Sequence, residues 1–166
     1  NFADPSAQGI AIAPGTAGAS SSLPIRFEIE SVINMDVSGT AYGNIQPDDQ
    51  MPGIPGTTSG INGIAGDIVT YLELSAGKHT FIVNSDDGFR TTVGTVGDAF
   101  QAQVAGEYSG SRGPSDTSFM VYVQEAGIYA FRTVWENTTG DGNIELLSVK
   151  TDDTKVLLND TANGGI

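Results

Sequence analysis

The strongest constraint on the fold of this chain is a series of short apolar segments separated by turn residues. Within each segment apolar and polar residues alternate, which places one face of a β-strand against a core. The breaks between segments are rich in Gly, Asp and Asn, and no segment shows a convincing helical period. We therefore predict an all-β fold, an antiparallel β-sandwich. The expected strands cover residues 68–74, 79–84, 89–94, 100–104, 119–123, 128–135, 143–150 and 155–158.

The first part of the chain differs in composition from the rest. Residues 1–22 are rich in Ala, Gly, Ser and Pro, and we interpret them as an arm or linker in which Ile10-Ala11-Ile12 could form one edge strand. Residues 24–33 alternate regularly and predict a half-buried strand, whereas residues 36–66 carry many Gly and Pro and predict a long irregular loop. The chain is long enough for one sizeable core, so we expect a single domain over residues 23–166.

The charge of the chain restricts its partners. Seven Lys and Arg residues face 20 Asp and Glu residues, a formal net charge of −13. Such a surface repels phosphate backbones and anionic membranes, so we expect no nucleic acid partner, whereas it suits divalent cations and neutral polymers. No stretch approaches the ~20 apolar residues of a membrane span, so we expect no membrane insertion. The abundance of Gly, Ser, Thr and Asn, and a start at Asn1 without Met, favour a piece of a longer extracellular or cell-surface protein.

A pair of adjacent carboxylates in Ser85-Asp86-Asp87-Gly88 predicts a calcium site, because Ca²⁺ prefers carboxylate and carbonyl oxygens. In an extended strand successive side chains point to opposite faces, so both carboxylates reach one ion only if the backbone between them departs from strand geometry. A cis peptide bond would do that. The alternative is an ordinary Asp-Gly turn. A second pair, Asp48-Asp49, has no flanking strand, and we interpret it as a solvated turn.

Two longer segments, taken together, resemble a known family. The first, residues 79–90, reads HTFIVNSDDGFR, a strand followed by a Ser-Asp-Asp-Gly turn and another strand. The second, residues 126–137, reads AGIYAFRTVWEN, and GDGNIEL follows at residues 140–146. In order and spacing, residues 66–158 resemble the PA14 superfamily. The resemblance implies a PA14-like β-sandwich of the jelly-roll type.

The sugar-binding branch of this superfamily implies a site as well as a fold. There an Asp–cis–Asp pair holds Ca²⁺, and sugar hydroxyls complete the coordination of the ion. A loop in the region of residues 136–143 contributes an Asn side chain and main-chain oxygens, and the sequence does not choose among the three polar residues in that window. The alternative for this loop is a polar hairpin turn. The candidate metal ligands are therefore Asp86, Asp87, Asn137, Asp141 and Asn143.

Three residues near these segments are candidates for direct contact with a ligand. Tyr108 lies in a Gly-rich stretch and is expected to be an exposed aromatic residue. Trp135, the only Trp, could form a wall of a sugar site, but it shares a strand face with Tyr129 and Phe131, which favours a core position. Arg90 follows the Ser-Asp-Asp-Gly turn and completes this set.

The sequence offers little for catalysis. It contains no G-x-S-x-G motif, no Cys nucleophile and no phosphate-binding loop. A Ser-His-Asp triad would have to use His79, the only His, and nothing near it supports that role. Some pair of carboxylates is inevitable among 20 acidic residues, so the acidic content does not indicate a glycosidase. We expect that the chain is not an enzyme.

We therefore expect a non-catalytic, calcium-dependent carbohydrate-binding module of the lectin or adhesin type, whose partner is a glycan or polysaccharide. The alternative is a structural or assembly module, such as an adhesin stalk, a surface-layer protein or a fibre subunit, with structural calcium or none. In that case the arm formed by residues 1–22 could self-associate by adding a strand to the sheet edge of a neighbour.

Overall fold

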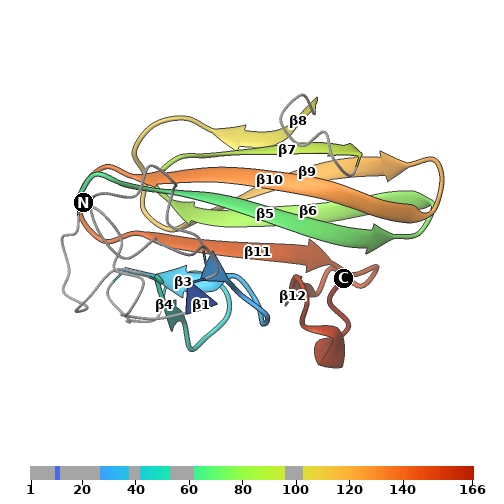
Figure 1. Ribbon diagram of the computed structural model, residues 1–166, viewed down its shortest axis with the longest axis horizontal. Helices are drawn as coiled ribbons and strands as arrows, with labels where there is room; N and C mark the ends of the chain where they lie inside the picture. The colour runs from blue at the N-terminus through green and yellow to red at the C-terminus, as the bar shows by residue number, and fades with distance from the viewer. Residues whose placement is uncertain (1–9, 12–26, 38–41, 53–61, 96–102) are drawn as a thin grey trace.

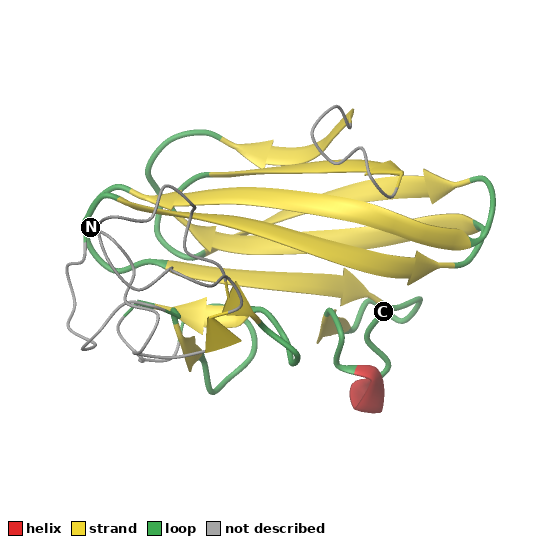
Figure 2. Ribbon diagram, viewed as in Figure 1, coloured by secondary structure: helices red, strands yellow, loops and turns green. Residues whose placement is uncertain are grey.

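The chain folds into two packed β-sheets, as the alternating segments predict (Figures 1 and 2). The computed structural model describes residues 10–11, 27–37, 42–52, 62–95 and 103–166. Within these ranges the helical structure is a single 3-10 turn, η1 (Thr161–Asn163). No helix in the described ranges is long and apolar enough to cross a membrane.

The described strands form one smaller and one larger sheet. The smaller sheet is antiparallel throughout and has the order β5 (Ile64–Leu74), β10 (Gly127–Asn137), β7 (Phe89–Thr95), β8 (Gln103–Tyr108). The larger sheet has the order β4 (Asp49–Gln50), β3 (Asn34–Asp36), β11 (Asn143–Val149), β6 (Gly77–Asp86), β9 (Ser115–Val123), and β12 (Lys155–Leu157) also pairs with β11. In it only β3 and β4 pair in parallel among the described strands. A separate ribbon joins β1 (Ile10–Ala11) to β2 (Phe27–Glu28).

The eight strands expected after residue 67 correspond to β5 to β12, with ends shifted by a few residues. Of the strand expected over residues 24–33, residues 24–26 lie outside the described residues and Phe27–Glu28 form β2, but the strand does not continue, since the pairing with β11 begins only at Asn34. The intervening apolar residues serve two different clusters. Ile29 and Ile33 pack against the central core, whereas Val32 packs against a second cluster, so this segment cannot remain one evenly alternating strand.

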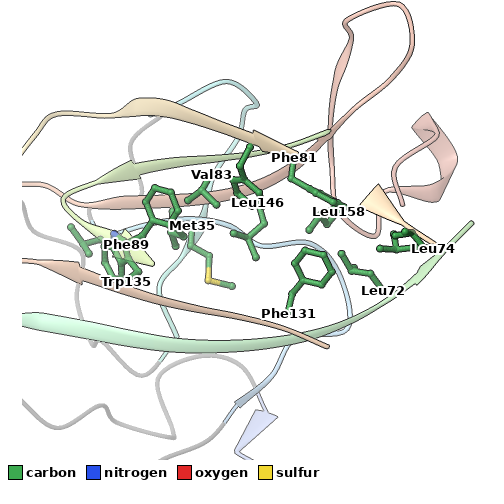
Figure 3. Packing of buried hydrophobic residues seen from close by; sticks show 14 residues of the cluster. Met35, Leu72, Leu74, Phe81, Val83, Phe89, Phe131, Trp135, Leu146 and Leu158 are labelled. Atoms are coloured by element: carbon green, nitrogen blue, oxygen red, sulfur yellow. The ribbon is translucent and has the colours of Figure 1, made fainter. Parts of the chain in front are cut away.

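The core lies between the two sheets (Figure 3). Alternate residues of β10 point into it, among them Phe131, which is 4 % exposed, and Trp135, which is 1 % exposed. Phe131 meets Phe81 of the larger sheet with a distance of 5.1 Å between ring centroids. Tilted aromatic pairs at such distances add to the stabilisation that burial of the rings provides. The core therefore fixes the faces of both sheets and the positions of the strand ends.

The two central strands of the larger sheet are buried on both faces. Ile82 of β6 and Leu147 of β11 face outward and form a small apolar cluster with Leu157 of β12. Residues 42–48, the covering loop, lie over this face, and Ile45 of the loop packs against the cluster. The long segment expected to be an irregular loop thus contributes to the packed structure.

A buried carboxylate fastens the covering loop to the sheet. Glu145 of β11 is fully buried, and its carboxylate accepts hydrogen bonds from the backbone N–H groups of Asn44, at 2.8 and 2.9 Å, and Ile45, at 2.8 Å. Gly43 has φ of 81°, and a Cβ there would lie 2.5 Å from the same carboxylate. On β3, Asn34 Nδ2 donates to the carbonyl oxygens of Ile45 and Pro47, at 3.1 and 3.0 Å. Polar contacts from two strands therefore define the path of the loop.

Glu145→Gln should lower the free energy of unfolding by about 2–4 kcal/mol, because an amide NH₂ would face backbone N–H donors in a buried site. Urea denaturation of the metal-free protein measures this difference. Glu73→Gln, an exposed position on β5, is the matched control and should change stability by less than about 0.5 kcal/mol. Equal stability of the two variants would contradict the role assigned to Glu145.

Candidate metal centre

The adjacent carboxylates lie where the chain passes from one sheet to the other. Asp86 ends β6 in the larger sheet, and Phe89 begins β7 in the smaller one. Figure 1 shows that the β6–β7, β8–β9 and β10–β11 turns share one end of the sandwich, on the left of the view. The peptide bond between Asp86 and Asp87 is cis, as expected for side chains that serve a common site.

Asp87 connects the other two turns at this end. One carboxylate oxygen accepts a hydrogen bond from the backbone N–H of Arg112 at 2.8 Å, in the β8–β9 turn. The other accepts from the backbone N–H of Thr138, at 2.9 Å, and from its hydroxyl, in the β10–β11 turn. Burial opposes ionisation, but these hydrogen bonds outweigh it and hold the pKa of Asp87 below its usual range. Asp87 is therefore an anion that fixes both turns.

Asp86 differs from Asp87, because neighbouring negative charges act on its carboxylate. Burial raises the pKa of Asp86 to about 6, and the charges of Asp87 and Asp141 add to the effect. Asp141 Oδ2 accepts a hydrogen bond from the hydroxyl of Tyr42 at 2.7 Å. Asp141 Oδ1 is buried and accepts no hydrogen bond from the residues that the structure describes. Such an oxygen is a ready ligand for a cation.

Asn137, at the end of β10, belongs to the same region. It is 1 % exposed, and its Nδ2 donates to the carbonyl oxygen of Gly140 at 3.3 Å. The returning chain passes so close that a Cβ at Gly142 would lie 2.7 Å from this nitrogen. The glycine therefore allows the β10–β11 turn to pack closely on the Asn137 amide. Asn137 is thereby held next to Thr138, which donates hydrogen bonds to Asp87.

The donor set suits calcium. Within the described ranges, no three Asp, Glu, His or Cys side chains are arranged to hold a metal ion by themselves. An ion bound by Asp86 and Asp87 would thus need amide or main-chain oxygens as well, and Ca²⁺ takes six to eight oxygen ligands of these kinds. The enclosed Asn137 amide is a candidate for such a ligand.

Asn143 lies beside this region in the larger sheet. It pairs in register with Asp86 on one side and with Asp36 on the other. It is 1 % exposed, and its Nδ2 donates to Asn84 Oδ1 at 2.9 Å. Asn143 is thus a strand residue, as are Asp86 and Asn137, whereas Asp87 and Asp141 lie in turns.

Arg112 is a residue of this region that the sequence analysis missed. Its guanidinium donates to the carbonyl oxygen of Ser85 at 3.0 Å, to the Ser85 hydroxyl at 2.7 Å and to the Thr117 hydroxyl at 2.9 Å. It also lies over the ring of Tyr108, 4.1 Å from the centroid. The available signal was a cation within a Gly- and Ser-rich stretch, in a chain with only seven Lys and Arg residues. Arg112 holds the residue before the carboxylate pair.

The three expected ligand contacts have different outcomes. Tyr108 is 36 % exposed, as expected, and the guanidinium of Arg112 stacks on its ring. Trp135 as a ligand contact is wrong, because its ring is buried in the core and its Nε1 donates to the carbonyl oxygen of Asp86 at 2.9 Å. Arg90 lies on the outer face of the smaller sheet, where its Nε is 2.9 Å from Glu107 Oε2, so it is not brought to the carboxylate pair.

Comparison with known structures identifies the fold. No model of a protein family matches the sequence, and no curated protein is significantly similar to it. The PA14 domain of the MpAFP antifreeze protein superposes with a TM-score of 0.51 at 18% identity, over 71% of this chain and 54% of that one. The chain has a PA14-like fold.

Two other solved structures were found in the same comparison. An anti-sigma factor domain-containing protein superposes with a TM-score of 0.58 at 15% identity, over 84% of this chain and 41% of that one. A PA14 sugar-binding domain from an RTX adhesin gives a TM-score of 0.48 at 21% identity, over 63% of this chain and 54% of that one. The chain thus spans about half the length of the solved chains that it matches.

The metal-free PA14-like domain should become less stable as the pH rises through about 6, where folded Asp86 ionises. An unfolded Asp ionises near pH 4, so between about pH 4 and 6 the folded chain binds more protons than the unfolded chain, and its free energy of unfolding falls with rising pH. Melting temperatures in chelator, measured from about pH 5 to about pH 7.5, test this. Asp86→Asn should flatten the slope, and an unchanged slope in this variant would contradict the assignment.

Proposed function

We propose that this chain is a non-catalytic carbohydrate-binding module that depends on calcium. Asp86, Asp87, Asn137 and Asp141 would hold the ion. When bound, Ca²⁺ offers coordination positions that vicinal hydroxyl groups of a sugar can fill. The Asp86–Asp87 pair carries the proposal, because burial and the charges of Asp87 and Asp141 raise the pKa of Asp86 and a cation would offset both effects.

The residues around the carboxylates have separate roles in this proposal. Asp87 positions the β8–β9 and β10–β11 turns as well as facing the ion. Tyr108, partly exposed beside Arg112, would contact the apolar face of a sugar ring. The β8–β9 turn would therefore govern specificity, whereas the carboxylates would supply the affinity for the ion.

The charge of the chain and the absence of the catalytic motifs considered above from its sequence support a binding role. A net charge of −13 favours neutral glycans over anionic partners. His79, the only His, lies near the start of β6, and its Nε2 is 2.8 Å from the carbonyl oxygen of Ser75, whereas the carboxylate pair follows the other end of that strand. We infer that the module acts within a larger secreted or cell-surface protein of the adhesin type.

A glycan array probed with and without chelator tests this function. The native chain should bind glycans with calcium, and both chelation and Asp86→Asn should reduce binding at least tenfold, because Asn supplies one neutral oxygen in place of a carboxylate. Asp153→Asn, at an exposed turn, is the control and should bind like the native chain. Glycan binding that survives both chelation and Asp86→Asn would refute the proposal.

Tyr108→Ala should weaken glycan binding roughly fivefold, as expected for the loss of about 1 kcal/mol of aromatic contact, while calcium affinity stays the same. Titration calorimetry measures both constants in one protein. Tyr122→Ala is the matched control, since Tyr122 is 75 % exposed on β9, outside the β8–β9 turn. A loss of calcium affinity in Tyr108→Ala would show that the ring supports the metal centre instead.

A structural role for the ion is the second candidate function. It is favoured by Asp87, since both of its carboxylate oxygens are used to fasten neighbouring turns. In that case calcium should raise the melting temperature of the native chain by more than that of Asp86→Asn, yet no glycan should bind. The array and the melting experiment together distinguish a sugar receptor from a structural or assembly module.

A further inference from the structure

A second group of polar residues lies on the outer face of the larger sheet, apart from the turns. Cross-strand partners share a face of a sheet, and two such rows cross β3, β11 and β6 here. One row consists of Asp36, Asn143 and Asp86, and the next of Asn34, Glu145 and Asn84. The covering loop, residues 42–48, is bound over these rows through Glu145 and Asn34.

Negative charge is concentrated beneath this loop. Asp36 and Glu145 are both 0 % exposed. Asp48 of the covering loop lies next to this strand face, because its neighbour Asp49 pairs in register with Met35 of β3. Lys155, a cation that reaches the loop, is bound to Asn44 Oδ1 at 2.7 Å and to the carboxylate of Asp116.

Three buried oxygens in this group accept no hydrogen bond from the described residues, namely Asn34 Oδ1, Asp48 Oδ1 and Asn143 Oδ1. The orientations of both amides are fixed, because each NH₂ group donates to a carbonyl oxygen. Asn34 Nδ2 donates to two carbonyls of the covering loop, and Asn143 Nδ2 donates to Asn84 on β6. Asn143 is the direct cross-strand partner of Asp36, so the two side chains share the outer face of the sheet. Asn34 and Asn143 are 2 % and 1 % exposed, so bulk water does not reach them.

We infer that these oxygens form a second divalent-cation site beneath the covering loop. Its ligands are Asn34 Oδ1, Asn143 Oδ1, Asp48 Oδ1 and the carboxylate of Asp36. Two carboxylates with two neutral amide oxygens suit Ca²⁺, whereas Mg²⁺ retains several waters and Zn²⁺ prefers His and Cys. This set contains only two acidic ligands, which is consistent with the absence of any three-residue Asp, Glu, His or Cys metal group within the described ranges.

The covering loop links the two sites through Tyr42. The backbone N–H of Tyr42 donates to Asp48 Oδ2 at 2.7 Å, and its hydroxyl donates to Asp141 Oδ2 at 2.7 Å. A cation beneath the loop would fasten the segment that holds Asp141. Only this coupling rests on the proposed function, because the second site is built from residues outside the turns.

Native mass spectrometry and calorimetry with Ca²⁺ alone count the bound ions. We expect two ions per native chain, one in Asp86→Asn, one in Asp48→Asn and none in the double variant. Asp49→Asn is the matched control, because Asp49 is the exposed neighbour of Asp48, and it should retain two ions. A native chain that binds one ion, lost in Asp86→Asn and retained in Asp48→Asn, would overturn the second site.

Because Asp48→Asn also alters an acceptor of the Tyr42 amide, a second measurement avoids this variant. In Asp86→Asn, calcium should slow hydrogen exchange of the Asn44 and Ile45 amides at least tenfold, since the ion would fasten the loop that carries them. Unchanged exchange of these amides would overturn the proposal. A single ion that is lost in Asp48→Asn and retained in Asp86→Asn would support the second site and refute the calcium site in the turns.

Discussion

The carboxylate of Asp87 is the interaction on which the end of the sandwich depends. Its two oxygens hold backbone N–H groups from two turns that are far apart in sequence, at Arg112 and Thr138. Since the same residue follows the last residue of β6, the carboxylate also ties those turns to the core strand. A charged acceptor of backbone N–H groups is stronger than a neutral one, so three otherwise independent turns are held as one unit.

The positions of the strands β5 to β12 along the chain could be predicted from the sequence, because short apolar segments alternate there with turn residues. The carboxylate pair could be recognised as well, because it lies beside a strand end, although the sequence did not choose among Asn137, Asp141 and Asn143. The distant residues that contact the carboxylate region could not be recognised from the sequence. Tyr42 and Arg112 reach the site from segments rich in Gly, Ser and Pro, whose local pattern carries no information about distant contacts.

The burial of Asp48 could not be predicted from the sequence either. The pair Asp48-Asp49 has the composition of a solvated turn, and Asp49 is indeed exposed, whereas one oxygen of Asp48 is fully buried. Asp48 and Asp49 differ in exposure because the covering loop folds back on β3 and β11. Hydrogen bonds with Glu145 and Asn34, which lie elsewhere in the chain, hold the loop in that position. Burial of charge was therefore a property of tertiary structure that no local pattern could indicate.

The indole of Trp135 has a consequence for how the molecule can be observed. It is the only Trp of the chain, it is almost fully buried, and its Nε1 donates to the carbonyl oxygen of Asp86. Indole emission depends on the field and the hydrogen bond at that nitrogen, and here both are set by the backbone of a carboxylate residue. The protein thus carries an intrinsic fluorophore hydrogen-bonded to Asp86 at one end of its sandwich. Changes of charge or geometry at Asp86 should therefore alter the fluorescence emission of Trp135, which can be measured without a label.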